Sequence, residues 1–377
     1  MVIVIIQPLL PNYDIDFLNE FQKTFPALEL LVLADIESNN SLNQFEAVKS
    51  TFKVQHLRLV EFLGFVFRPG LLRFLQNNLS SIIVFNGNPR DISQLFAMVL
   101  LWLLGRDFCV WGMFHRIGGP RLISSIYYKI VGKLARKCLC YSRTGATNLV
   151  SLGVCSSRIG IVGTAINERV PTAVRLSKSA AVLESFRKSA GLQGKHLVLQ
   201  VVRLSRYKRP ELLISAAELM GAKRKDIVFA LIGGGEMLEE LQQLVVAKGL
   251  GDFIQFLGPI YDELILADWY LSASAFVVPT CIGLSAHHAM AYGVPVITDD
   301  SLSGQASEFA IVSDGLNGLT YREGCAASLA STIERVIDDG ILRARLSSNA
   351  LATVNEIYTI NAKVQNFSSL ILEDSSK

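Results

Sequence analysis

The sequence predicts an α/β protein built from two doubly wound domains with a cleft between them. Three observations lead to this fold class. A chain of 377 residues is too long for one ordinary core and suits two domains of about 150 to 200 residues each. Short apolar strands alternate with amphipathic helices in both halves, which is typical of parallel sheets covered by helices on both faces. A polar stretch poor in strand residues, near 168 to 194, separates the two series.

The first half begins with Val-Ile-Val-Ile-Ile, a continuous apolar run of the kind that forms a strand buried on both faces. Later runs of β-branched and aromatic residues predict further strands, and apolar residues spaced three or four apart predict helices. The predicted strands are Val2–Ile6, Leu28–Leu33, Ile82–Phe85, Phe108–Trp111, Lys137–Tyr141 and Ile159–Val162. The predicted helices lie near Ile15–Thr24, Ile92–Leu104, Leu122–Ala135 and Gly145–Leu152.

The second half repeats this alternation after the polar stretch. Its predicted strands are His196–Val202, Ile227–Ile232, Phe253–Phe256, Ala275–Val278, Val294–Thr298 and Phe309–Val312. Its predicted helices are Pro210–Met220, Met237–Lys248, Tyr261–Trp269, Leu284–Tyr292, Ala326–Asp338 and Ile341–Ile357. We therefore expect a first domain over 1–170, a hinge or linker over 171–194 and a second domain over 195–357. The remaining segment, 358–377, can pack back on the first domain.

Composition argues against several classes of protein. Half of the residues are apolar, yet no apolar run reaches the roughly 18 to 20 residues that cross a bilayer. The longest candidate, Leu95 to Leu104, is expected to be a buried or interfacial helix. Met1 leads directly into the first strand with no charged leader, which favours a cytoplasmic protein. The six cysteines show no metal-ligand spacing, so we expect buried, reduced thiols.

Charge is distributed unevenly along the chain. Residues 1–180 carry 19 Lys and Arg against 11 Asp and Glu, whereas the remainder carries 17 against 22. Between Phe62 and Arg143, 11 basic residues are accompanied only by Asp91 and Asp107, and apolar residues are interleaved with them. This combination suits an anionic membrane surface or a lipid-phosphate acceptor. The alternative is a solvated helix face over a normal core. Nucleic acid is less favoured, because no recognised binding module accompanies the charge.

The most informative segment is Val277–Ile297. It predicts a buried strand, a glycine turn, a short helix, a Gly-Val-Pro sequence and a second buried strand. A helix that begins after a glycine presents free backbone N–H groups and the positive end of its dipole. The amides of Gly283, Leu284 and Ser285 are therefore expected to bind an anion, and a diphosphate is the obvious candidate.

Two cations are expected on the opposite side of this anion site. Arg203 and Lys208 lie in the loop between the first strand and first helix of the second domain. There they can neutralise a leaving diphosphate as its bond to another group breaks. The run Gly233-Gly234-Gly235 also follows a strand and opens a helix, but it lacks the Lys-Ser/Thr of a P-loop, so ATP hydrolysis is not indicated.

The segment Val277–Ile297 resembles the donor-sugar motif of retaining glycosyltransferases of family 4, the group 1 type, which have the GT-B fold of two Rossmann-like domains. The matching residues are Gly283-Leu284, Ala289-Met290-Ala291 and Gly293-Val294-Pro295-Val296-Ile297. Both glutamates of the motif are absent: Thr280 stands at the first and His288 at the second. A hydroxyl can hold a sugar OH but cannot supply negative charge, and an imidazole can hydrogen-bond a ribose hydroxyl.

The resemblance extends to neighbouring segments and implies further donor contacts. Arg203 and Lys208 resemble the family's Gly-Arg-Leu motif and its following Lys, with Val202 in place of the Gly. Glu308 is the retained acid of a Pro-Glu motif in which Ser307 replaces the Pro, and Asp314–Gly318 resembles an Asp-Gly-x-Asn-Gly turn. The donor-binding set implied by the resemblance is Thr280, Ile282, Gly283, Leu284, Ser285, His288, Glu308, Gly234 and Ile260.

In the first domain, His115 follows a strand whose end is expected to face the cleft. We assign it to the catalytic set with Arg203 and Lys208, as a contact for the sugar or acceptor; a structural loop histidine is the alternative. Asp14 and Asp16 form a spaced acidic pair at an expected helix start, where acidic residues are common, so no metal role is assigned to them.

The resemblance therefore implies a GT-B glycosyltransferase that uses a UDP- or GDP-sugar, retains anomeric configuration and is expected to require neither a metal nor another cofactor. The resemblance suggests a lipid-linked saccharide or similar acceptor in the synthesis of O-antigen, capsule or another bacterial surface glycan, at the inner face of the cell membrane. Two alternatives stay open. A sugar-nucleotide epimerase or hydrolase would act on the donor alone, and a non-catalytic partner protein would bind the donor without turnover.

Overall fold

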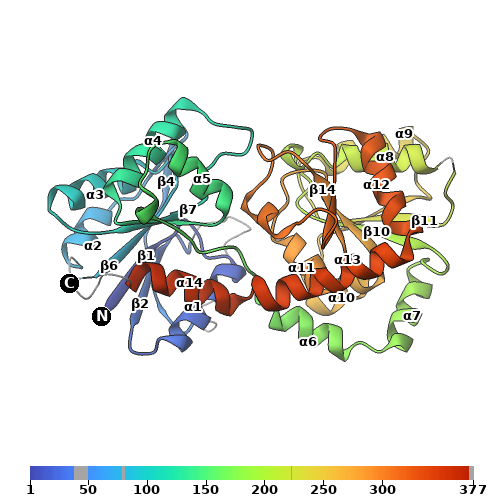
Figure 1. The fold of residues 1–377 in the computed structure, drawn as a ribbon, viewed down its shortest axis with the longest axis horizontal. Helices are drawn as coiled ribbons and strands as arrows, with labels where there is room; N and C mark the ends of the chain where they lie inside the picture. Colours follow the sequence, from blue (N-terminus) through green and yellow to red (C-terminus); the bar gives the residue numbers. More distant parts are fainter. Residues whose placement is uncertain (38–49, 79–80, 222, 373–377) are drawn as a thin grey trace. The chain divides into compact units, whose positions relative to one another are not determined.

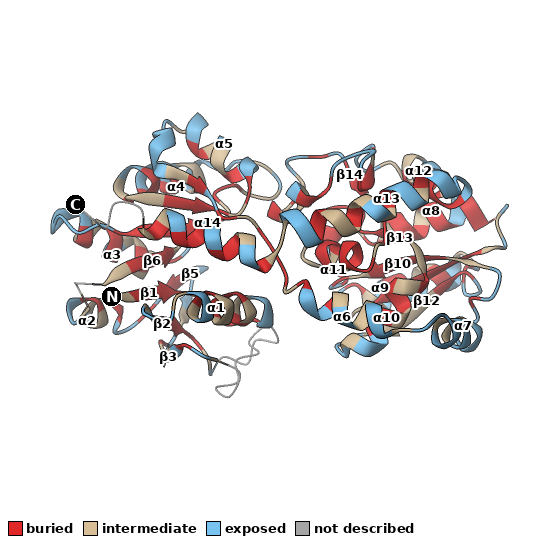
Figure 2. Ribbon diagram, turned by 60° about the horizontal axis from the view of Figure 1, so that its bottom comes forward, coloured by how far each residue is buried: buried red, intermediate tan, exposed pale blue. Residues whose placement is uncertain are grey.

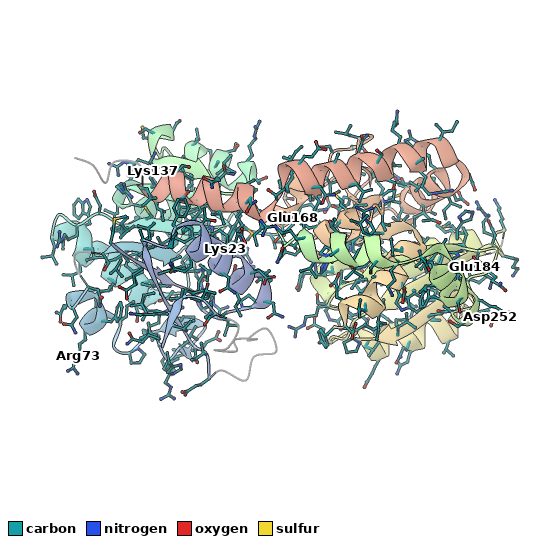
Figure 3. All side chains as sticks on the ribbon, turned by 90° about the horizontal axis from the view of Figure 1, so that it is seen from below. Lys23, Arg73, Lys137, Glu168, Glu184 and Asp252 are labelled. Atoms are coloured by element: carbon teal, nitrogen blue, oxygen red, sulfur yellow. The ribbon has the colours of Figure 1, made fainter. Side chains whose placement is uncertain are left out.

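The computed structural model describes residues 1–37, 50–78, 81–221 and 223–372 (Figure 1). The chain forms two compact units. The first comprises Met1–Asn167 together with Ile360–Lys377, and the second comprises Glu168–Thr359. Each unit is built on one parallel sheet with helices packed against it. Exposed charged side chains such as Glu184 and Asp252 lie at the periphery of the second unit (Figure 3).

The sheet of the first unit has seven parallel strands in the order β3-β2-β1-β6-β7-β8-β9. Its strands are β1 (Val2–Ile6), β2 (Glu29–Ala34), β3 (Lys53–His56), β6 (Ile82–Asn86), β7 (Cys109–Gly112), β8 (Lys137–Cys140) and β9 (Ile159–Ile161). An antiparallel hairpin consists of β4 (Val60–Phe62) and β5 (Phe65–Phe67). The helices are α1 (Asn12–Thr24), α2 (Leu71–Gln76), α3 (Ile92–Leu103), α4 (Leu122–Leu134), α5 (Arg143–Ser151), η2 (Ser156–Arg158) and α14 (Ile360–Leu372).

Two apolar cores lie on the two faces of this sheet. Because side chains alternate along a strand, Val4 and Ile6 of β1 join a core with α2, α3, α4 and α5. Ile3 and Ile5 of the same strand join the other core, with α1 and α14. The centre of the sheet is therefore buried on both sides, as the continuous apolar run of β1 predicts, and Figure 2 shows β1 and β6 largely in the buried colour.

The last helix, α14, returns to the first unit after the chain has formed the second. The ring of Phe367 lies 5.4 Å from that of Phe17, 5.7 Å from that of Phe21 and 5.2 Å from that of Trp111. Close packing is possible here because β9 has a glycine at position 160: a Cβ there would lie 2.3 Å from a methyl group of Leu370. The helix thus completes the core of the first unit.

The second unit has six parallel strands in the order β12-β11-β10-β13-β14-β15. The strands are β10 (His196–Val201), β11 (Ile227–Ile232), β12 (Ile254–Gly258), β13 (Ala273–Val277), β14 (Val296–Asp299) and β15 (Gly318–Tyr321). The longer helices are α6 (Arg169–Ser177), α7 (Ala180–Ser189), α8 (Glu211–Gly221), α9 (Leu238–Ala247), α10 (Glu263–Ser272), α11 (Ser285–Ala291), α12 (Ala326–Asp338) and α13 (Gly340–Ala352). Short turns are η3 (Arg206–Lys208), η4 (Ser307–Ile311) and the π-helical η5 (Thr353–Ile357).

Each sheet contains one point where the chain reverses its direction of winding. From β1 the chain moves outward through β2 and β3 and then returns to β6, on the other side of β1. From β10 it moves outward through β11 and β12 and then returns to β13. In open parallel sheets ligands bind beyond the carboxyl ends of the strands at such a switch point. A ligand site in the second unit is therefore expected at the loops after β10 and β13.

Several elements differ from the sequence-based prediction. Residues 171–194, expected to form a hinge or linker, instead form most of α6 and all of α7, and they belong to the second unit. The predicted strand Phe309–Val312 is wrong, because Ser307–Ile311 is the 3₁₀ turn η4. The edge strand β3 and the strand β15 were not predicted. In β3, Lys-Val-Gln-His is partly exposed along its length and so lacks an apolar run.

Candidate functional site

Lys208 lies beside the glycine turn that follows β13. Its side chain is only 9% exposed, and its Nζ donates a 2.6 Å hydrogen bond to the carbonyl oxygen of Cys281. A Cβ on Gly283 would lie 3.8 Å from the same nitrogen. Lys208 forms no ion pair within the described part of the chain. Its Nζ also lies 5.5 Å from the centre of the Tyr207 ring. A buried ammonium whose contacts are neutral groups keeps its charge, and this favours an anion nearby.

The turn after β13 is held in an unusual backbone conformation. Cys281 has φ of +52°, in the left-handed region that costs a non-glycine residue about 1 kcal/mol. The next amide, that of Ile282, donates to Oε1 of Gln305 at 2.9 Å. Lys208 and Gln305 thus hold this turn from two sides, which fixes the direction of the amides that follow.

The three following amides belong to Gly283, Leu284 and Ser285, which are half-buried. Across residues 1–37, 50–78, 81–221 and 223–372, no hydrogen-bond acceptor is assigned to these N–H groups. They precede or begin α11, whose dipole adds positive potential. Together with the Lys208 ammonium, they form a candidate anion site at the switch point, and we refer to Lys208, Gly283, Leu284 and Ser285 as the anion turn.

Behind the anion turn lies a buried polar network that the sequence reasoning missed. Nε2 of Gln305 donates to Oγ1 of Thr298 at 2.8 Å and to Oδ1 of Asp299 at 2.7 Å. Burial raises the pKa of Asp299 above its ordinary value, although hydrogen bonds from Thr280 and Gln305 oppose this. Thr280, expected at the sugar, is 5% exposed and contacts this carboxyl group. The available sequence signal was the acidic residue Asp299 at the end of the apolar strand β14.

His288, on α11, pairs with a carboxylate that the sequence reasoning also missed. Its Nε2 lies 3.5 Å from Oε2 of Glu263, in the first turn of α10. The hydroxyl of Tyr292 donates to Oε1 of Glu263 at 2.5 Å, and the Tyr292 ring stacks on Tyr270 at 5.3 Å. Burial lowers the pKa of His288, and the Glu263 charge opposes this effect only in part. The neutral imidazole is therefore favoured near neutral pH, with an acidic group beside it.

The glycine run after β11 packs against the loop that carries Arg203. The amide of Leu204 donates to the carbonyl oxygen of Gly234 at 2.9 Å. A Cβ on Gly233 would lie 1.9 Å from the carbonyl oxygen of Val202, and the φ of +140° at Gly233 also favours glycine. Gly233 is thus required by the close approach of two loops, whereas a Cβ on Gly234 would meet no neighbouring atom. Arg203 itself is exposed between β10 and η3.

The remaining sequence-predicted residues fall into two groups. Glu308 is half-buried in η4, and its charge acts on the thiol of Cys281, so it lies near the anion turn. Ile260 is half-buried in the loop between β12 and α10. Asp314–Gly318 is a structural turn: Asp314 accepts from the amide of Thr320 at 2.7 Å, and the buried Asn317 bonds to Ile311 and Thr353.

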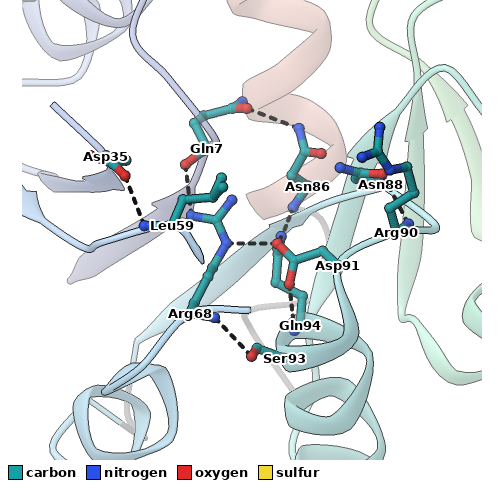
Figure 4. Close-up of polar contacts among 10 residues, drawn as sticks. All are labelled: Gln7, Asp35, Leu59, Arg68, Asn86, Asn88, Arg90, Asp91, Ser93 and Gln94. Carbon is teal, nitrogen blue, oxygen red and sulfur yellow. Dashed lines mark hydrogen bonds and ion pairs between the residues drawn. The ribbon is translucent and has the colours of Figure 1, made fainter. Parts of the chain in front are cut away.

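The switch point of the first unit is occupied by a buried ion pair (Figure 4). Nε of Arg68 donates to Oδ2 of Asp91 at 2.6 Å, and its Nη1 donates to the carbonyl oxygen of Gln7 at 3.2 Å. Nδ2 of Asn86 donates to Oε1 of Gln7 at 3.0 Å. Asp91 also caps α3 through the amide of Gln94. Because Arg68 and Asp91 neutralise each other, this network braces the loops after β1 and β6.

His115 follows β7 in the first unit and is 7% exposed. Its Nδ1 lies 3.1 Å from the carbonyl oxygen of Met113, so one ring nitrogen is engaged with the backbone. No group of three or more His, Cys, Asp or Glu side chains that could hold a metal ion occurs among the described residues. None of the helices described is long and apolar enough to cross a membrane.

Comparison with known proteins bears on this site directly. Residues 183–353 match the family of glycosyl transferases group 1. This segment lies within the second unit and contains the anion turn, Arg203, His288 and Glu308. The chain is 34% identical over 167 residues to a D-inositol 3-phosphate glycosyltransferase of Frankia alni, covering 41% of this chain and 40% of that protein. It is 27% identical over 180 residues to the alpha-D-kanosaminyltransferase of Streptomyces kanamyceticus, covering 47% and 45%. The chain thus spans less than half the length of these curated relatives.

Solved structures are similar over almost the whole chain. The Anabaena protein Alr3699/HepE in complex with UDP has a TM-score of 0.78 at 17% identity, covering 98% of this chain and 99% of that one. The sucrose-phosphate synthase of Thermosynechococcus elongatus has a TM-score of 0.71 at 19% identity, covering 98% of both chains. These similarities, with the two parallel sheets, confirm the predicted fold: the chain has the GT-B fold of two Rossmann-like units.

Proposed function

We propose that this protein transfers a sugar from a nucleotide-diphosphate donor, a UDP- or GDP-sugar, to an acceptor hydroxyl with retention of configuration. The observation that carries the proposal is the hydrogen bond from Lys208 to the Cys281 carbonyl. It places a buried cation at the switch point, beside three amides suited to a diphosphate. The match of residues 183–353 to glycosyl transferases group 1 supports the same reading.

In the proposed reaction, the bond between the sugar C1 and the phosphate oxygen breaks while the acceptor oxygen bonds to C1 from the same face. The acceptor proton passes to the leaving phosphate. Lys208, Arg203 and the amides of the anion turn stabilise the charge that develops on the diphosphate, so we propose that neither a metal nor another cofactor is required. His115 is proposed to contact the sugar or acceptor, and Thr280, backed by Asp299, to hold a sugar hydroxyl.

We propose that the nucleoside lies between the loops after β11 and β12 and the pair His288–Glu263. Gly234, Ile260 and Ile282 would line its base and ribose, and Glu308 would contact the sugar or ribose. A neutral imidazole next to a carboxylate offers both a donor and an acceptor to a ribose diol. The structurally similar Alr3699/HepE is described in complex with UDP and with UDP-glucose, so UDP-sugars are the first donors to test.

For the acceptor we propose a lipid-linked saccharide, used in the synthesis of O-antigen, capsule or another surface glycan by a peripheral membrane enzyme. The support is the excess of cations and apolar residues in the first unit. The curated relatives named D-inositol 3-phosphate glycosyltransferases make a phosphorylated polyol the natural soluble acceptor to test beside it.

The test is a thermal-shift screen of UDP-, GDP- and CMP-sugars, followed by measurement of nucleotide release with and without acceptor. One donor class should raise the melting temperature of the wild type and do so much less for Arg203→Ala. Arg206→Ala is the matched control, because Arg206 is an exposed cation of the same loop that pairs with Glu240. If no donor stabilises the wild type, the proposal fails. Release without acceptor would indicate an epimerase or hydrolase, and binding without turnover a non-catalytic protein.

A further inference from the structure

The first unit carries an exposed apolar surface that the donor site does not use. α3 and α4 pack side by side on the same face of the sheet (Figure 1). Their inner sides, which include Met98 and Val131, are fully buried in one core. The sequence-based prediction for Leu95 to Leu104 was a buried or interfacial helix; in the structure one side of α3 is buried and the other is exposed.

The outer sides of both helices are apolar. On α3, Phe96 is 59%, Trp102 52% and Leu103 68% exposed. On α4, Leu122 is 76%, Ile126 50% and Ile130 41% exposed, and their spacing of four residues places them on one stripe. We call these six residues the α3–α4 face. A helix side turned to water is normally polar, so exposed large apolar side chains on two adjacent helices mark a contact surface.

Cations accompany the α3–α4 face. Arg106, Arg121, Lys129 and Lys133 are exposed on these helices or at their ends. In the described ranges of the chain none of the four forms an ion pair. Between Phe62 and Arg143 the acids are Asp91, which is buried and paired with Arg68, and the exposed Asp107. The surface is therefore apolar and net positive.

We propose that the α3–α4 face docks on an anionic lipid bilayer, with its apolar side chains in the interfacial region and the four cations against lipid phosphates. This deepens the proposed function, because it names the surface on which a lipid-linked acceptor would be presented. Charge decides between occupants: a second copy would bring these cations opposite each other, whereas an anionic bilayer supplies the opposite charge.

The fluorescence of Trp102 can report contact between the α3–α4 face and a bilayer. Of its three tryptophans, Trp111 and Trp269 are buried at 1% and 7% exposure, and Trp102 belongs to the α3–α4 face. Vesicles of phosphatidylcholine with roughly 30% phosphatidylglycerol should shift Trp102 emission to the blue, and the protein should float with them. Vesicles of pure phosphatidylcholine should bind far less of the protein. Trp102→Phe should remove the spectral shift while the protein still floats.

The decisive variant is Ile126→Glu/Ile130→Glu, which should weaken partitioning about tenfold or more. Ile341→Glu is the matched control, since Ile341 is 86% exposed on α13 of the second unit, and it should leave partitioning unchanged. Lys129→Glu/Lys133→Glu should weaken binding to anionic vesicles and reduce its salt dependence. Circular dichroism and the melting temperature check that each variant folds.

Equal partitioning of Ile126→Glu/Ile130→Glu and the wild type would overturn the proposal. So would the absence of binding to anionic vesicles, or a lipid-free dimer in which Trp102 is already shielded. Vesicle binding without stabilisation by any donor would instead refute the proposed function alone, because the two sites lie in different units.

Discussion

At the scale of single residues, the candidate site depends on a lysine that contacts a carbonyl instead of a carboxylate. The Cys281 carbonyl fixes the position of the Lys208 ammonium without neutralising it. A carboxylate partner would have removed the charge that a diphosphate needs. His288 shows the opposite arrangement, since burial favours its neutral form and the charged group beside it is a carboxylate, that of Glu263 at 3.5 Å. The two positions thus suit different parts of a nucleotide sugar.

A prediction at the residue scale concerns Asp14 in α1. Burial raises the pKa of Asp14 to about 6, and Lys363, whose Nζ lies 4.4 Å from the Phe17 ring centre, opposes this. Because the folded state holds this proton more tightly than the unfolded state, stability should fall as pH rises from about 4 to 6. Asp14→Asn should therefore raise the free energy of unfolding by about 2 kcal/mol at pH 7.5 and have little effect at pH 4.

Urea unfolding at the two pH values tests this, with the exposed Asp252→Asn as control (Figure 3). An equal effect of Asp14→Asn at both values would show that burial of the charge is not its cause.

Sequence patterns located most of the site residues but not their partners. The glycine turn and the loop of Arg203 and Lys208 have fixed spacings, so they are visible in the chain itself. Glu263 and Gln305 are not, because each reaches the site from a segment distant in the sequence, Glu263 from α10 and Gln305 from the loop after β14. The motif position of Thr280 indicated a lost negative charge, whereas the fold brings Asp299 against the same hydroxyl.

At the scale of elements, α14 is the most consequential addition to the first unit. Phe367 is fully buried among three aromatic rings contributed by α1 and β7. Phe367→Ala should lower the stability of the first unit by about 3 to 5 kcal/mol, because it leaves a cavity in a closely packed core. Gln365→Ala, on the exposed side of the same helix, should be nearly neutral.

Urea unfolding of the intact chain provides the measurement. The Phe367→Ala variant should lower the midpoint of the transition that donor does not affect and leave the donor-sensitive transition in place. A variant as stable as the wild type would mean that α14 contributes little to this core.

The boundaries of helices and strands were predictable where a run of apolar residues along the chain marks the element. β1 and β11 are continuous apolar runs, β10 is mostly apolar, and all three appear almost as predicted. The stretch 171–194 was misassigned because α6 and α7 are largely exposed helices, and α7 has no fully buried residue. Helix α7 is joined to the rest of the unit by a side-chain hydrogen bond that the sequence pattern does not predict: Arg187 donates to the carbonyl oxygen of Ser272 at 2.9 Å.

At the scale of the whole molecule, the two sheets have the same winding but carry different polar groups at their switch points. The switch point of the first unit is closed by the neutral pair Arg68–Asp91, whereas that of the second unit keeps a charged lysine and free amides. Alternating strands and helices revealed the two sheets, because that periodicity is local. The return of α14 is a long-range contact, so the local pattern allowed it but did not require it.

The proposed function depends most directly on binding of the nucleotide-sugar diphosphate by the anion turn. Titration calorimetry with UDP, or with the nucleotide selected in the donor screen, tests it on the wild type, Lys208→Met and Arg206→Ala. Loss of a charged hydrogen bond should raise the Kd of Lys208→Met about 10- to 100-fold, whereas Arg206→Ala should bind like the wild type. Equal affinity of the wild type and a folded Lys208→Met, or an equal loss in both variants, would contradict it.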